Sequence, residues 1–309
     1  MNMSQFLECF KNFCKVYYSR VFSALALIII FVLLNAFSYA MYDSYGSKLK
    51  SLFSGRMSAD SSGSSSGSSD YSSSDSTTSS WDDSQCNVVG INMHGYLDTY
   101  ALSGDNSTAS ADTVLSYIRQ ANDKENIKAI LLEVDSGGGS SVAGEEIANA
   151  LKNSPKETVA VIRQQGASAA YWASTGAKYI FASKNSDVGS IGVTASYLSD
   201  VEKNKKAGLT YVDLFVGKYK EMGNPDRVLT QEEKDLYMRD LNIILDNFVQ
   251  AVSTNRHLPL TKVRSLADGS SMLGVQAQKA GLIDGIGDVT DAEKYLTNKL
   301  GEKAEICWN

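Results

Sequence analysis

The sequence predicts an α/β fold, in which a largely parallel sheet carries helices on both faces. Stretches such as 127–135 (IKAILLEVD) and 157–163 (ETVAVIR) are almost continuously apolar, which is typical of parallel strands buried on both sides. Segments with helical spacing alternate with these strands along the chain, the pattern of βαβ units. The three prolines, at 155, 225 and 259, all fall between expected elements.

The expected elements follow one another from residue 87 onward. Strands are predicted at 87–95, 127–135, 157–163, 178–183 and 210–216. Helices are predicted at 110–123, with Ser110 as the N-cap, and at 142–152, 167–175 and 231–254. One domain, residues 84–309, accommodates all of these elements without internal repeats.

An apolar segment precedes this domain. Residues 21–42 contain no charged side chain, and as a helix they would span roughly 33 Å, enough to cross a bilayer core. We therefore expect a transmembrane helix, preceded by an N-terminal segment at 1–20. A cleaved signal peptide, ending near Ser38-Tyr39-Ala40, and a buried core helix are the alternatives. The long lead and the long apolar run favour an uncleaved anchor, whereas the flanking charges favour neither orientation.

A serine-rich segment joins this anchor to the domain. Between 58 and 80, 14 of the 23 residues are Ser, and such a composition cannot bury enough apolar surface to become ordered. We therefore expect residues 43–83 to be a flexible linker.

Charge and cysteine content narrow the range of functions. The net charge is −6, so no broad basic surface is expected and nucleic-acid binding is not predicted. His94 and His257 are isolated and no CxxC is present, so we expect neither a metal site nor a cofactor. Cys86 and Cys307 bracket the domain, and they either form a disulfide in an oxidising compartment or remain free thiols.

Two glycine-containing stretches follow apolar strands and carry candidate chemistry. In 132–141 (LEVDSGGGSS), three glycines precede a helix, so backbone N–H groups there could approach an oxyanion or a phosphate, or simply form a turn. The spacing fits neither GxGxxG nor a phosphate loop. In 163–174 (RQQGASAAYWAS), Ser168 is surrounded by small residues. Ser168 is either a nucleophile or part of a small-residue helix, and Ala170 excludes the GxSxG pattern.

A serine nucleophile needs a base. His94 and His257 are possible by residue type, but no acid is evidently placed to orient either of them. Lys218 and Lys220 follow the predicted strand at 210–216, and a lysine becomes a base when desolvation or a nearby positive charge lowers its pKa. Residues two apart share a face of an extended segment, so spacing does not choose between these lysines, and most lysines are solvated surface charges.

The motifs resemble those of the signal peptide peptidase A family, membrane-anchored serine peptidases with a Ser/Lys dyad in a ClpP/crotonase-like fold. The resemblance covers residues 86–300 and the anchor. DSGGGS resembles the family turn Asn-Ser-Pro-Gly-Gly-Gly, and GASAAYWAS resembles Ala-Ala-Ser-Gly-Gly-Tyr-Tyr. Three further stretches match in the same order: VGSIGV (188–193), GKYKEMGNPDRVLTQEE (217–233) and GVQAQKAGLIDGIG (274–287).

This resemblance implies a role for five residues. Ser168 is the nucleophile and Lys220, rather than Lys218, is the general base. Ser190 orients the lysine, and the backbone N–H groups of Gly139 and Ala169 form the oxyanion hole. The short, single-domain members form rings in which adjacent protomers supply the serine and the lysine, so we expect a homo-oligomer.

The same resemblance implies a single-pass protein of the cell membrane whose domain lies outside the cytoplasm. Its substrates would be signal-peptide remnants or other extended apolar peptides. Ala169 and Ala170 replace family glycines and Gly137 replaces a proline, which bears on specificity more than on the reaction. A catalytically inactive membrane scaffold and an acyl-CoA enzyme of crotonase type are the competing functions.

Overall fold

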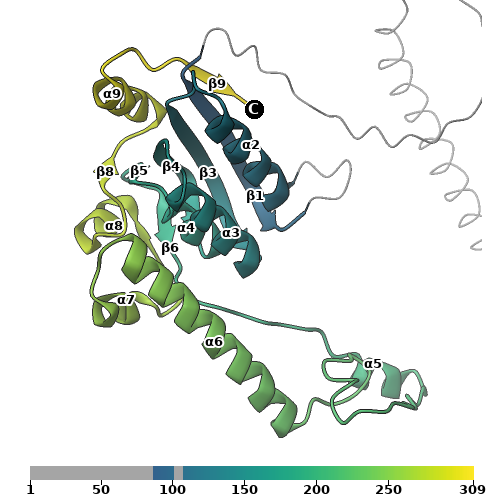
Figure 1. Cartoon of the computed structure of the whole chain (residues 1–309). Coiled ribbons are helices and arrows are strands. Elements are labelled where there is room, and N and C mark those ends of the chain that lie inside the picture. The colour runs from purple at the N-terminus through teal and green to yellow at the C-terminus, as the bar shows by residue number, and fades with distance from the viewer. Residues whose placement is uncertain (1–85, 101–106) are drawn as a thin grey trace, which may run out of the picture. The chain divides into compact units, whose positions relative to one another are not determined.

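A computed structural model of the chain describes residues 86–100 and 107–309 (Figure 1). The expected segments 1–20, 21–42 and 43–83 lie outside the described residues. Across the described ranges, no helix combines the length and the apolar character needed to span a membrane.

In the described part of the chain, a nine-stranded sheet forms the centre of the domain, and its main path runs β2-β1-β3-β4-β5-β8 with parallel pairing throughout. β6 extends the sheet by pairing with the end of β4, β7 pairs antiparallel with β6, and β9 pairs with β1. The strands are β1 (Val88–Asp98), β2 (Thr108–Ser110), β3 (Ala129–Gly139), β4 (Glu157–Ala167), β5 (Tyr179–Ala182), β6 (Asp187–Gly189), β7 (Ser271–Leu273), β8 (Gly285–Ile286) and β9 (Ile306–Trp308).

The apolar strands are buried on both faces, as the sequence predicts. Along β3, Ile130, Leu132 and Val134 belong to a large core cluster, whereas Ala129 and Leu131 belong to a second cluster on the opposite face. This alternation follows from the two-residue period of a strand. An α/β fold with a mostly parallel sheet is therefore confirmed.

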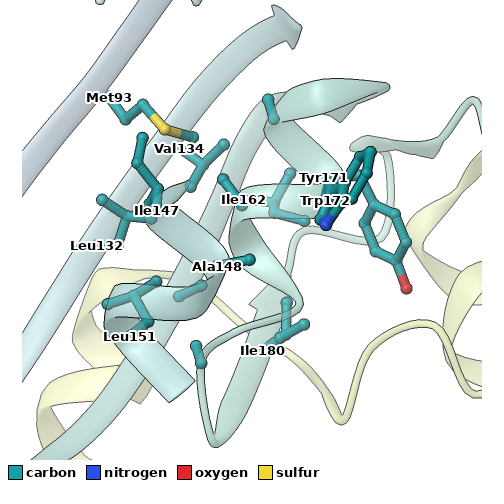
Figure 2. Packing of buried hydrophobic residues seen from close by; sticks show 14 of the residues in the cluster. Met93, Leu132, Val134, Ile147, Ala148, Leu151, Ile162, Tyr171, Trp172 and Ile180 are labelled. Carbon is teal, nitrogen blue, oxygen red and sulfur yellow. The ribbon is translucent and has the colours of Figure 1, made fainter. Parts of the chain in front are cut away.

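The larger cluster lies under helices α2, α3 and α4 and the end of α6. Figure 2 shows Ile147 and Leu151 of α3 beside Leu132 and Val134 of β3. Ser110 caps α2 by accepting from the Thr113 N–H, which confirms the predicted N-cap. The helices are α2 (Ala111–Asp123), α3 (Ser141–Lys152), α4 (Ala169–Ser174), α5 (Val201–Lys206), α6 (Gln231–Asn255), α7 (Leu260–Leu266), α8 (Gly274–Ala280) and α9 (Val289–Leu300).

Helix α6 divides into two halves with different surroundings. Near its C-terminal end, Phe248, Val249 and Val252 are buried in the core. Its N-terminal half extends away from the sheet and ends beside the segment that contains α5 (Figure 1). We name residues 200–230 the α5 lobe.

The predicted strand at 210–216 is wrong, because this segment has no regular secondary structure. Val212 is 76% exposed, and Leu214 and Val216 are each 96% exposed. A strand needs a neighbouring backbone to accept its hydrogen bonds, and within the described part of the chain no strand lies beside these residues.

A disulfide joins the two ends of the domain. Cys86 precedes β1 and Cys307 lies in β9, and their Cα atoms are 5.8 Å apart. β9 pairs in parallel with β1, and the Trp308 ring covers Gly90, where an added Cβ would overlap the ring. Of the two states that the sequence left open for these cysteines, the structure contains the bonded one.

Candidate active site

Ser168 lies at the junction between β4 and α4. It is half-buried, with backbone angles of φ 54° and ψ −127°, a conformation that a non-glycine residue adopts at a cost of roughly 1–3 kcal/mol. Its hydroxyl makes no capping bond to α4. Gly166, two residues earlier, has no space for a side chain because a Cβ there would lie 2.8 Å from Ile162. The local chain is therefore a tight strand–turn–helix that presents the Ser168 hydroxyl to its surroundings.

Ser190 lies next to Ser168, at the end of β6. The register pairs Ala167, the last residue of β4, with Gly189, the last residue of β6. Ser168 and Ser190 directly follow these two paired residues. The Ser168 N–H donates to the Gly189 carbonyl at 2.8 Å. Ser190 also has a positive φ, 49°, and its hydroxyl donates to the Gly269 carbonyl at 2.9 Å.

The glycine turn after β3 lies against the same point. Gly138 and Gly139 have φ values of 98° and 156°, which glycine adopts readily and other residues rarely do. A Cβ on Gly138 would lie 2.8 Å from Ser168 Cβ and 2.9 Å from Ala169 N. Only glycine therefore allows this close approach, which brings the turn beside Ser168 and Ala169.

The buried hydroxyl of Ser136 holds this turn in place. It donates to the Gly95 carbonyl at 2.6 Å and accepts from the Gly138 N–H at 3.1 Å. It thereby links the turn to the end of β1. These two hydrogen bonds restrain the turn, and a preorganised backbone is the property that makes an oxyanion site effective.

A cavity of about 610 Å³ opens at this junction. Ser168, Ser190, Gly139 and Ala169 line it together, so four of the five predicted site residues meet in one place. Ala169 and Ala170 stand at the positions where glycines were expected from the resemblance. Ala169 lines the cavity, whereas Ala170 is fully buried in the core.

Part of the cavity lining forms an apolar wall. Trp172 of α4 stacks on Phe248 of α6 with ring centroids 4.8 Å apart, and Leu241 and Ile244 of α6 lie beside them. This wall was not predicted from the sequence. A signal for it was present, because residues 241, 244 and 248 have the three- and four-residue spacing of one helix face.

Lys220 does not line this cavity. It lies in the α5 lobe. Figure 1 shows this lobe beside the end of α6 that is farther from the sheet. Within one chain, the structure therefore brings together the serines and the glycine turn but not the predicted base.

The two lysines of the lobe differ in their partners. Lys218 Nζ donates to Glu232 Oε1 at 2.6 Å, and this hydrogen bond raises the pKa of Lys218. A lysine that is held in its charged form is a poor base. For Lys220, only a backbone hydrogen bond to Gly217 occurs among the described residues, so its side chain is free of such a partner.

Neither histidine lies at the candidate site. His94 Nε2 is 3.0 Å from Glu133 Oε1, on the strands of the sheet. His257 lines a separate cavity with Lys152, Arg256 and Asp284. A half-buried serine beside a preorganised glycine turn is the arrangement found in serine hydrolases.

Peptidase family S49 matches residues 150–303, a range that contains Ser168, Ser190 and Lys220. A protein of Methanocaldococcus jannaschii that is named as a protease is 37% identical over 185 residues, covering 58% of this chain and 60% of the relative. A protein of Enterococcus faecium that is named as a signal peptide peptidase SppA is 29% identical over 229 residues, covering 70% and 66%. The chain thus spans less than two thirds of the length of either relative. It belongs to peptidase family S49, the signal peptide peptidase A family of serine peptidases.

A solved structure of a ClpP1 mutant from Listeria monocytogenes is similar at 12% sequence identity and a TM-score of 0.45, covering 65% of this chain and 92% of that one. This score is too low to support an argument about function. The α/β class of this chain rests on its own sheet topology.

Proposed function

We propose that the chain is a membrane-anchored serine endopeptidase that uses Ser168 as the nucleophile and Lys220 of an adjacent protomer as the general base. The observation that carries the proposal is the convergence of Ser168, Ser190, Gly139 and Ala169 on one cavity. The family match over the same region supports it.

The proposed reaction proceeds through an acyl-enzyme. Neutral Lys220 takes the Ser168 proton as Oγ attacks the peptide carbonyl carbon, and the carbonyl oxygen becomes negative between the N–H groups of Gly139 and Ala169. The carbon–nitrogen bond breaks, and the leaving amine takes the proton from Lys220. Water then attacks the ester, giving its proton to Lys220. The ester bond breaks, Lys220 returns its proton to Ser168 Oγ, and the acid product leaves.

The separation of the lobe from the cavity supports the proposed oligomer. The lobe exposes large apolar side chains, among them Leu209, Val212, Leu214 and Val216. Contiguous exposed apolar side chains mark interaction surfaces. In a ring of identical protomers, this surface would contact a neighbour and bring its Lys220 to the neighbour's Ser168.

The apolar wall supports the proposed substrate class. Trp172, Leu241, Ile244 and Phe248 offer an apolar side chain of the substrate a surface beside Ser168. Extended apolar peptides, such as remnants of signal peptides, meet this requirement.

The proposed location outside the cytoplasm rests on the Cys86–Cys307 disulfide. Disulfides persist in oxidising compartments and are rare in the cytosol. Together with the uncharged segment at 21–42, this bond favours a domain tethered at the extracytoplasmic face of the cell membrane.

The direct test is hydrolysis of a fluorogenic peptide with leucine before the scissile bond, by the full chain in detergent micelles. Ser168→Ala and Lys220→Ala should each lose nearly all activity, whereas Lys218→Ala should retain most of it. A folded, oligomeric wild type without activity would instead favour the catalytically inactive scaffold.

A further inference from the structure

The α5 lobe is ordered without a hydrophobic core. Among residues 200–230, Leu229 alone is buried, and α5 buries no residue at all. Apolar burial is the usual stabilising contribution to a folded segment. Polar contacts must therefore fix the shape of the lobe around Lys220.

Lys220 itself lies in a tight turn. Its N–H donates to the Gly217 carbonyl at 3.0 Å, and Gly217 and Gly223 have φ values of 104° and 84°. Gly223 lies against the Tyr237 hydroxyl of α6, which leaves no space for a Cβ. The turn is thus seated against the first half of α6.

Glu221, the residue after Lys220, accepts several hydrogen bonds within the lobe. The Glu221 carbonyl accepts from the Asn224 N–H at 3.2 Å and from Arg227 Nε at 2.9 Å. The Glu221 carboxylate accepts from Asn224 Nδ2 at 2.7 Å. Arg227 therefore binds the backbone that carries Lys220.

Arg227 is in turn fixed by Glu233, in the first turn of α6. Arg227 Nη1 donates to Glu233 Oε2 at 3.2 Å and Nη2 donates to Oε1. The Glu233 side chain is only 4% exposed, and it also accepts from the Thr230 N–H and hydroxyl at 2.9 and 3.0 Å. The hydrogen bonds from Arg227, and then from Thr230, lower the pKa of Glu233 to about 2.

A single guanidinium thus connects the Lys220 turn to a nearly buried carboxylate at the start of α6. Arginine suits this task because its donors lie in a fixed plane, so that one edge binds Glu233 while Nε binds the Glu221 carbonyl. Lysine, with one rotating ammonium, cannot satisfy both partners in this way.

We propose that Arg227 and Glu233 are positioning residues for the general base: they hold the Lys220 turn in the conformation that presents its side chain to the neighbouring active site. This inference rests on the proposed function. Arg227 and Glu233 would then affect catalysis through the position of Lys220, in addition to stabilising the lobe.

The test compares Glu233→Gln with wild type in the full chain. We expect kcat/KM to fall by about 10-fold or more, because small displacements of a catalytic group are costly. The loss, measured per folded chain, should appear in kcat with KM within about twofold of wild type, because no residue of the α5 lobe lines the substrate cavity.

A second variant and a control separate positioning from stability. Arg227→Lys keeps the charge and should reproduce the loss of kcat. Asp240→Asn removes an exposed ion pair with Arg239 farther along α6, and it should remain within about twofold of wild type. Amide hydrogen exchange should accelerate at residues 217–224 in the first two variants, with the exchange of the β-sheet unchanged.

Two results would overturn the inference. One is a Glu233→Gln enzyme with wild-type kcat/KM per folded chain. The other is a loss of activity that scales with the unfolded fraction while the exchange at 217–224 stays unchanged. If the wild type hydrolyses nothing, the proposed function fails separately, and the exchange data alone decide whether Arg227 and Glu233 order the Lys220 turn.

Discussion

Ser168 and Ser190 directly follow the paired last residues of two neighbouring parallel strands, β4 and β6. Both serines have a positive φ, 54° and 49° respectively. The pairing of Ala167 with Gly189 immediately before them fixes their separation. Two non-glycine residues in this conformation side by side indicate that the surrounding structure imposes it, which is common at functional sites. The two serines of the site therefore lie at the carboxyl ends of strands β4 and β6.

The backbone of Ser168 predicts an unusual effect on stability. Ser168→Gly should have a free energy of unfolding about 1 kcal/mol greater than Ser168→Ala, because glycine relieves the strain at φ 54° by more than it costs in chain entropy. Chemical denaturation of both inactive variants measures this difference. Equal stabilities would show that the junction is not strained.

Ser190 should affect catalysis more than stability. Ser190→Ala removes the hydroxyl that donates to Gly269, which should cost about 1 kcal/mol in unfolding free energy. If Ser190 also orients Lys220, kcat should fall by about 10- to 100-fold. A variant with wild-type kcat would remove Ser190 from the proposed machinery.

Ile244 should contribute to the choice of substrate. Ile244→Ala shortens the apolar wall, so kcat/KM for a leucine peptide should fall by about 10-fold, with a much smaller change for an alanine peptide. Ile243→Ala is the matched control, since Ile243 is 52% exposed and does not line the cavity. Equal losses for both peptides would contradict a specificity role.

The disulfide should stabilise the domain as one unit. Cys86→Ser, Cys307→Ser and the double variant should each lose about 2–4 kcal/mol of unfolding free energy, and the double variant should lose no more than either single one. Denaturation under oxidising and reducing conditions provides the comparison. Additive losses would mean that the two thiols act independently.

The sequence predicts strands β1, β3, β4 and β5 because their signals are local. Apolar runs defined β3 and β4, and Ser110 marked the start of α2. The glycines at 137–139 were recognised as a candidate oxyanion turn, and the structure places that turn beside Ser168. Each of these features depends on neighbours within one short stretch of chain.

The remaining features depend on contacts that a local pattern does not contain. The apolar wall forms only because α6 packs its end against α4. Residues 210–216 have the composition of a strand but lack a partner strand among the described residues. Residue spacing does not choose between Lys218 and Lys220, and the Glu232 contact that raises the pKa of Lys218 joins residues 14 positions apart in the sequence.

Ser168 and Lys220 are proposed to act across a protomer boundary. Co-expression of the inactive Ser168→Ala and Lys220→Ala chains, followed by the leucine-peptide assay, tests this proposal most directly. We predict about a quarter of the wild-type activity, since one boundary in four of a random mixture would pair an intact Ser168 with an intact Lys220. Mixed oligomers that contain both chains and have no activity would contradict a dyad shared between protomers.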